Sequence, residues 1–290
     1  MKFFRILLAP LDFIMKYFKA LVFLLVLFLI FAPSGESSSK VANLARIDLN
    51  GPILRSDTFL EKLALLESNE NIKGILLVVD SPGGAIAPSV EISEAIKRVA
   101  AKKPVVAYAQ GSMASGSYLS SIWASYIVAN KGSLIGSIGV IINGANVEEL
   151  LNKIGIKSQS LKAGIYKEAG TFARAWTKDE ESMLKGLVDE QYYMFVSEVA
   201  TARGLNLSDE KYFAQGRVFS ANNALKLRLV DSVGSIYDAE IALMKLANIQ
   251  NAIWLKKDKI DLYLEKLIGE NISLGIERGI YSIFGALKGQ

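Results

Sequence analysis

The stretch from Val105 to Val140 constrains the possible folds more than any other part of the chain. An apolar run from Pro104 to Ala109 passes into a series of small residues, Gly111-Ser-Met-Ala-Ser-Gly-Ser117. Small residues let a backbone turn sharply from a strand into a helix and leave a serine hydroxyl accessible. The first N–H groups of that helix would point toward the hydroxyl, where an anion could be held. We therefore predict a strand, a turn that displays a serine, and a helix.

Strand and helix patterns alternate around this stretch. Residues 72–79 form a nearly continuous apolar run, as expected for a central parallel strand that is covered on both faces. Apolar residues recur at helical spacing in residues 56–68 and 89–101. Shorter strands are predicted at residues 42–49 and 126–129, and a helix at 113–124. The alternation predicts an α/β fold with parallel strands and right-handed crossovers.

The second half carries one strong helix signal. Thr177-Lys-Asp-Glu180 is a capping box, and it predicts a long helix that ends at Arg203 before Gly204. Helices are also predicted at residues 147–154 and 236–247, and a short edge strand at 157–161. No internal repeat is evident, so residues 42–250 are predicted to form one domain.

The two ends of the chain differ from this domain. Residues 20–33 are apolar and, with the three residues before them, approach the ~20 needed to span a bilayer. Four basic residues and one acidic residue precede the run, which predicts a cytoplasmic N-terminus and an anchor in residues 1–33. A cleaved signal peptide is the alternative. Residues 34–41 are predicted to be a linker, and residues 251–290 an amphipathic extension that lies on the membrane, contacts a partner or is mobile.

The composition restricts the chemistry. The chain contains no histidine and no cysteine, which excludes a Ser-His-Asp triad, a Cys-His pair and any zinc site made from those residues. A nucleophilic serine would need a desolvated lysine, a carboxylate or the N-terminal amine as its base. The formal charge of +4 is too small and too scattered to indicate nucleic-acid binding. We predict neither a metal nor a cofactor.

Local patterns alone leave the site residues open. Five serines lie in residues 112–121, and all could be small packing residues. Met113 stands where a G-x-S-x-G elbow needs glycine, which counts against an α/β-hydrolase. The loop at residues 80–84 is either a simple turn or an oxyanion hole, because glycine N–H groups can approach a reacting carbonyl. Ser137 is either a packing residue or a group that orients a base.

Four segments resemble one known family. They are Asp80-Ser-Pro-Gly-Gly84, Met113-Ala-Ser-Gly-Ser-Tyr118, Gly132-Ser-Leu-Ile-Gly-Ser-Ile-Gly139 and Lys162-Ala-Gly-Ile-Tyr-Lys-Glu168. Their order and spacing resemble signal peptide peptidase A, or protease IV, in its short single-domain bacterial form. The resemblance covers roughly residues 42–250 and implies a Clp-protease/crotonase-like fold. This sequence departs from the family's pattern at Ser220-Ala221, and at Arg228 where the family has glycine. These departures put the local turn geometry there in doubt.

The resemblance implies a Ser/Lys dyad. Ser115 falls on the family's nucleophile, Lys167 on its general base and Ser137 on the serine that orients the lysine. Gly84 falls on the oxyanion-hole glycine, and Gly116 is expected to add a second N–H. Glu168 is a concern, because a carboxylate that reached the lysine amine would favour its charged form. We expect Glu168 to point elsewhere.

The resemblance also implies the function. It indicates a serine endopeptidase of the bacterial inner membrane, with its catalytic domain outside the cytoplasm, that degrades remnant signal peptides and other hydrophobic peptides. It further implies a dome-shaped homo-oligomer, an octamer for short members, in which the serine of one subunit meets the lysine of the next. A crotonase-like acyl-CoA enzyme and a non-catalytic membrane scaffold are the alternatives.

Overall fold

The computed structural model describes residues 16–20, 22–24 and 41–256 and divides the chain into two units, Met1–Val41 and Ala42–Gln290. In the first unit, residues 16–20 and 22–24 are helical. The rest of the predicted anchor, the linker up to residue 40 and the C-terminal extension from residue 257 lie outside the described residues. Among the residues that are described, no helix combines the length and the apolar character needed to cross a bilayer.

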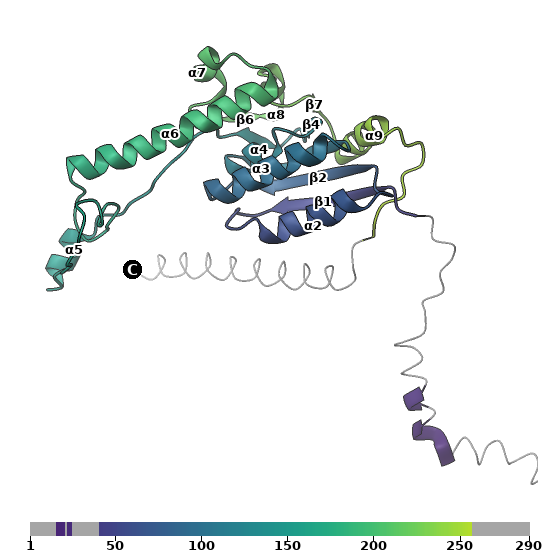
Figure 1. Ribbon diagram of the computed structural model, residues 1–290, viewed down its shortest axis with the longest axis horizontal. Helices are drawn as coiled ribbons and strands as arrows, with labels where there is room; N and C mark the ends of the chain where they lie inside the picture. The colour runs from purple at the N-terminus through teal and green to yellow at the C-terminus, as the bar shows by residue number, and fades with distance from the viewer. Residues whose placement is uncertain (1–15, 21, 25–40, 257–290) are drawn as a thin grey trace, which may run out of the picture. The chain divides into compact units, whose positions relative to one another are not determined.

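Seven strands of the described part form one sheet in the second unit (Figure 1). The strands β1, β2, β3, β4 and β7 lie side by side in that order, and β5 joins β3 to β6. Every pairing is parallel except that of β5 with β6. Their bounds are β1 Leu44–Asn50, β2 Gly74–Ser81, β3 Val105–Ala114, β4 Tyr126–Ala129, β5 Leu134–Gly136, β6 Val218–Ser220 and β7 Ser232–Val233. The predicted α/β fold with a mainly parallel sheet is confirmed.

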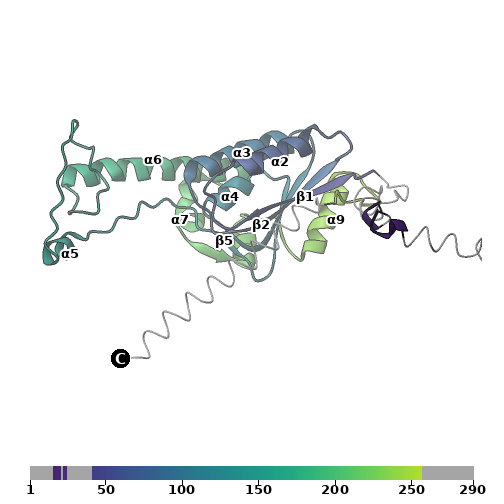
Figure 2. The ribbon, with the colours of Figure 1, turned by 90° about the horizontal axis from the view of Figure 1, so that it is seen from below.

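The sheet has two covered faces because its central strands alternate side chains between them. In β2, Ile75, Leu77 and Val79 pack with the helices α2 (Asp57–Ser68), α3 (Ile86–Ala100) and α4 (Gly116–Ser121). Leu76 and Val78 pack on the opposite face with α9 (Ile236–Leu246). Figure 2 shows the two helical layers on either side of the strands. The continuous apolar run in the sequence reflects this double burial.

Strand β3 extends further than the sequence pattern predicts. Its first half pairs with β4, and Ser112–Ala114 pair with β5, so the sheet forks along this strand. The pairing with β2 is irregular between Val79 and Ser81, where the register shifts. The prediction that a helix starts at Met113 was wrong, because these cross-strand hydrogen bonds keep the backbone extended up to Ala114. Helix α4 starts at Gly116 instead.

Helix α6 (Lys178–Arg203) confirms the predicted capping box and the glycine that ends it. Thr177 and Glu180 exchange both capping hydrogen bonds, and Gly204 adopts the left-handed conformation with φ 59°. The short elements η1 (Leu207–Asp209), α7 (Glu210–Phe213) and α8 (Ala221–Lys226) follow. Arg228, where the family has glycine, also has a positive φ of 61°. The turn is therefore retained, in a conformation that glycine adopts without strain.

Residues 140–176, here called the arm, connect β5 to α6 and carry the helix α5 (Glu148–Lys153). Figure 1 shows α5 near the end of α6 that is remote from the sheet. The outgoing and returning runs of the arm meet where the Val147 N–H donates to the Phe172 carbonyl, at 2.9 Å. The strand predicted at residues 157–161 was wrong: these residues are exposed and belong to no strand, because the described part of the chain offers them no neighbouring sheet edge.

Candidate active site

Ser115 lies at the turn between β3 and α4. Its backbone has φ 53° and ψ −126°, a conformation that residues with a side chain rarely adopt. Its N–H donates a 2.7 Å hydrogen bond to the carbonyl of Gly136 at the end of β5. Strained residues of this kind cost about 1–3 kcal/mol and cluster at functional sites. The predicted strand–turn–helix unit thus displays Ser115 at its most strained point.

The structure separates Ser115 from the other serines of this stretch. Ser117, Ser120 and Ser121 are buried, and each hydroxyl donates to a backbone carbonyl. The backbone N–H of Ser112 donates to the carboxylate of Asp80. Ser115 is only partly buried, and no hydrogen bond of its hydroxyl is found within the described residues. Packing therefore accounts for the three buried serines, and of the two partly buried ones Ser115 is the one with the strained backbone.

Gly84 and Gly116 bring two backbone N–H groups together beside Ser115. A methyl group on Gly116 would lie 3.3 Å from the Gly84 nitrogen and 2.3 Å from the Ser89 hydroxyl oxygen. The Gly84 N–H has no backbone acceptor in the described part of the chain, and the Gly116 N–H is the first of α4, where helices leave N–H groups unpaired. This arrangement could hold a developing oxyanion.

Two hollows include Ser115 among their lining residues. The smaller one, of about 80 Å³, contains both glycines and is otherwise mainly apolar, with Ile86, Leu119, Val140, Ile141, Met194 and Phe195 among its lining residues. The larger one, of about 630 Å³, joins Ser115 to Ser137. Ser137 also has a positive φ, 51°, and it directly follows the glycine that accepts the Ser115 N–H. The structure thus brings four of the five predicted site residues together.

The sequence patterns did not predict two residues that line the larger hollow. Gln215 has a φ of 63°, and its side-chain amide donates a 2.9 Å hydrogen bond to the Tyr192 hydroxyl. Burial raises the pKa of Tyr192, which favours its neutral hydroxyl. Both residues lie far from Ser115 in sequence and line the same hollow. The helical pattern places Tyr192 on α6 but gives no sign of which helix face meets Ser115.

Lys167, the fifth predicted site residue, is not part of this cluster. It is an exposed residue of the arm and lines neither hollow at Ser115. The next residue, Glu168, is joined through Arg174 to Glu180 in the first turn of α6.

The apolar hollow beside Ser115 is lined by a later part of α6, from Gln191 onward. Glu180 and Gln191 are about three turns apart, or roughly 16 Å along the helix axis. Lys167 and Ser115 of one chain are therefore not in hydrogen-bonding contact.

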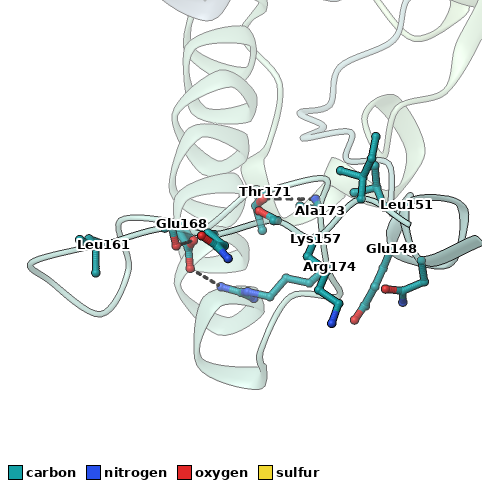
Figure 3. A pocket seen from close by; sticks show the side chains of 13 residues that line it. Glu148, Leu151, Lys157, Leu161, Glu168, Thr171, Ala173 and Arg174 are labelled. Atoms are coloured by element: carbon teal, nitrogen blue, oxygen red, sulfur yellow. Dashed lines mark hydrogen bonds and ion pairs between the residues drawn. The ribbon is translucent and has the colours of Figure 1, made fainter. Parts of the chain in front are cut away.

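The hydrogen bonds of the Glu168 carboxylate go to residues other than Lys167. The carboxylate accepts hydrogen bonds from Lys162 and Ser160, and one from Arg174 that Figure 3 shows as a dashed line. The hydrogen bond from Lys162, followed by that from Ser160, lowers the pKa of Glu168 to about 2. Among the described residues, no group of three or more carboxylates is placed to hold a metal ion.

Comparison with known proteins identifies the family. The profile of peptidase family S49 matches residues 97–250, and that of Clp protease matches residues 35–129. A protein from Methanocaldococcus jannaschii, named by inference as a protease, is 38% identical over 78% of this chain and 74% of its own length. An Enterococcus faecium protein, named by inference as signal peptide peptidase SppA, is 33% identical over 67% of this chain and 57% of its own length.

A solved structure shares the fold. A mutant of the 1510-N membrane-bound stomatin-specific protease aligns with 76% of this chain and 100% of its own, with a TM-score of 0.53 and 16% identity. The fold is thus the α/β, Clp-protease-like fold with a parallel sheet that the sequence predicted. Because the S49 profile spans more than half of the chain and the M. jannaschii relative matches over most of its length, this chain belongs to peptidase family S49, as a short-form member of the signal peptide peptidase A group.

Proposed function

We propose that this S49 peptidase is a serine endopeptidase with a Ser/Lys dyad shared between subunits. Ser115 would be the nucleophile and Lys167 of the partner subunit the general base. The observation that carries the proposal is the Ser115 turn: a strained, partly buried serine close to the backbone of Gly84 and Gly116. With no histidine in the chain, a desolvated lysine is the base that this family membership supports.

The chemistry follows from these groups. The neutral amine takes the proton of the Ser115 hydroxyl while the oxygen attacks the scissile carbonyl, and the Gly84 and Gly116 N–H groups hold the resulting oxyanion. The tetrahedral intermediate then expels the leaving amine, which receives the proton from the lysine, and an acyl-enzyme remains. Water, deprotonated by the same lysine, releases the acid and restores the serine. Ser137 lies in the same hollow and would orient the lysine amine.

The separation of Ser115 from Lys167 supports a shared site. Lys167 is exposed at the arm, where a second subunit could exclude water from it, and an amine works as a base when burial disfavours its charged form. Exposed apolar side chains on the arm, among them Ile154, Ile156, Leu161 and Ile165, are suited to contact a second copy. We propose a closed homo-oligomer, an octamer in the form that the family resemblance implies.

Substrate and location are further parts of the proposal. The hollow of about 80 Å³ has room for a small apolar side chain next to the scissile bond. The apolar run at residues 20–33 and the basic residues before it support an anchor in the inner membrane, with the peptidase domain outside the cytoplasm. Remnant signal peptides, which are apolar and lie in the membrane, are therefore the proposed substrates.

Peptide hydrolysis tests the catalytic proposal. The full chain in detergent, wild type beside Lys167→Ala, is assayed on a fluorogenic peptide with a small apolar residue before the scissile bond. Wild-type cleavage with a background rate for Lys167→Ala is the expected result. Equal cleavage by both proteins would show that Lys167 is not the base. A folded, oligomeric but inactive wild type would favour a scaffold, and binding of coenzyme A would favour the crotonase-like alternative.

A further inference from the structure

The chain places a carboxylate directly beside the residue proposed as its base. Glu168 follows Lys167, so an unrestrained Glu168 side chain could reach the lysine amine. Asp189, by contrast, lines the hollow of Ser115 and Ser137 and is paired with Lys185. A carboxylate in contact with an amine favours the charged ammonium, which cannot accept a proton from serine. A lysine base in this position therefore needs other hydrogen-bond donors that bind the Glu168 carboxylate.

Two cationic side chains and a hydroxyl group donate hydrogen bonds to the Glu168 carboxylate. The Lys162 ammonium lies 2.5 Å from Oε2, and the Arg174 guanidinium lies 3.3 Å from the same oxygen. The hydroxyl of Ser160 donates to Oε1. The Glu168 side chain is 25% exposed, so these bonds are partly shielded from water. Figure 3 shows Glu168 directed toward Arg174.

Arg174 is itself fixed to the start of α6. Its guanidinium donates two hydrogen bonds to the Glu180 carboxylate, of 2.9 Å and 2.7 Å. Glu180 is buried, with 3% of its side chain exposed, and completes the capping box with Thr177. A bidentate arginine–carboxylate pair of this kind has a defined geometry. The pair with Glu180 thus fixes the position of the guanidinium that also donates to Glu168.

The backbone on either side of Glu168 is also folded into turns. The Lys167 N–H donates to the Gly164 carbonyl at 3.3 Å, and the Thr171 N–H donates to the Glu168 carbonyl at 2.9 Å. Holding the Glu168 side chain therefore also restrains the direction in which the neighbouring lysine leaves the chain.

We propose that Lys162 and Arg174 are positioning residues for the peptidase reaction. They hold Glu168 against the start of α6, which keeps its carboxylate away from Lys167 and presents the lysine amine to the serine of the partner subunit. This inference rests on the proposed function of Lys167. Other charged groups near Glu168 are Glu148 and Lys157, which line a hollow of the arm together with Glu168 and Arg174 (Figure 3), and Glu180, which is bonded to Arg174.

The test compares pH–rate profiles of the full chain. In Lys162→Met/Arg174→Gln, Glu168 is released and can pair with Lys167, so the acidic limb of kcat/KM is expected to move up by about one pH unit. At a pH below that limb, kcat/KM of the variant is then expected to be about tenfold lower than that of wild type. Adding Glu168→Gln removes the carboxylate and is expected to return the limb to its wild-type position. Lys162→Met alone, which leaves the capping box intact, is expected to shift the limb in the same direction by less.

The chain offers a matched control. Glu67 is held by Arg98 and Lys102 in the same way, at 3.2 Å and 2.6 Å, on the surface of the sheet domain. Arg98→Gln/Lys102→Met removes an equivalent pair of cations and is expected to leave the pH profile unchanged.

A second measurement does not depend on turnover. The rate at which Lys167 is acetylated by acetic anhydride, followed by mass spectrometry across pH, reports how much neutral amine is present. It is expected to fall in Lys162→Met/Arg174→Gln and to recover when Glu168→Gln is added.

If acetylation and the acidic limb stay at their wild-type positions in Lys162→Met/Arg174→Gln, the positioning role is wrong, even where Lys167→Ala is inactive. If Lys167→Ala hydrolyses peptide as fast as wild type, the proposed function fails, and acetylation alone decides whether Glu168 is held away from Lys167.

Discussion

Mixed oligomers of two inactive variants test whether the site is shared. Within one chain, the segment that carries Lys167 is tied to the first turn of α6, whereas the larger and smaller hollows at Ser115 meet α6 about two and three turns later. Ser115→Ala and Lys167→Ala are each expected to reduce hydrolysis to background. In a closed ring, each site would take its serine from one subunit and its lysine from the next.

The expected recovery can be calculated. In oligomers assembled from equal amounts of the two variants, a site is complete when its serine comes from a Lys167→Ala subunit and its lysine from a Ser115→Ala subunit. Each condition is met half of the time, so about a quarter of the sites are complete, whatever the number of subunits in the ring. Activity is therefore expected to recover to about a quarter of the wild-type value.

The assay combines co-expression, native mass spectrometry to verify mixing, and hydrolysis of the fluorogenic peptide. Ser115→Ala mixed with the Ser115→Ala/Lys167→Ala double variant is the control, because no subunit in that mixture supplies the serine. Verified mixed oligomers that stay at background would refute the shared site, and the separation along α6 would then need another explanation.

Three further predictions follow from the geometry. Ser115→Gly is expected to abolish hydrolysis yet stabilise the fold by about 1 kcal/mol, because glycine adopts φ 53° without strain; a lower melting temperature than wild type would contradict this. Gly84→Ala would place a methyl group 2.1 Å from the Ile53 carbonyl oxygen and displace the neighbouring N–H, so kcat/KM is expected to fall on the order of 10²-fold, and an unchanged kcat/KM in a folded protein would argue against the oxyanion hole. The hydrogen bond from Arg174, the largest cause, lowers the pKa of Glu180 to about 2, as that from Lys162 does for Glu168. Because both pKa values lie below the usual 4.5, the contribution of these carboxylates to arm stability is complete above pH 4.5 and is lost as the pH falls toward 2. Trp176 lies in the arm and donates to the Thr171 carbonyl, so acrylamide quenching of its fluorescence should increase in that pH window. Quenching that begins near neutral pH would show that other groups hold the arm.

Local rules predicted most of the elements and few of their contacts. The double-sided burial of β2 and the capping box of α6 are encoded in consecutive residues, and both were confirmed. The end of β3 was not, because Ser112–Ala114 stay extended only through pairing with β5, which comes later in the chain. The strand expected at residues 157–161 failed for the same reason, since a strand needs a partner that its own sequence does not specify.

The residues themselves determined which chemistry is open to this protein. The absence of histidine and cysteine excluded the common triads, and the order of the glycine- and serine-rich segments indicated the family. Only the tertiary structure decided which serines serve packing, because Ser117, Ser120 and Ser121 are buried and their hydroxyls donate to backbone carbonyls of β2 and α4. It also decided that Lys167 lies away from Ser115, because α6 is a rigid rod whose first turn holds the arm and whose later turns pack against the sheet. Proximity between distant residues depends on how such elements pack, and neither periodicity nor spacing along the chain records it.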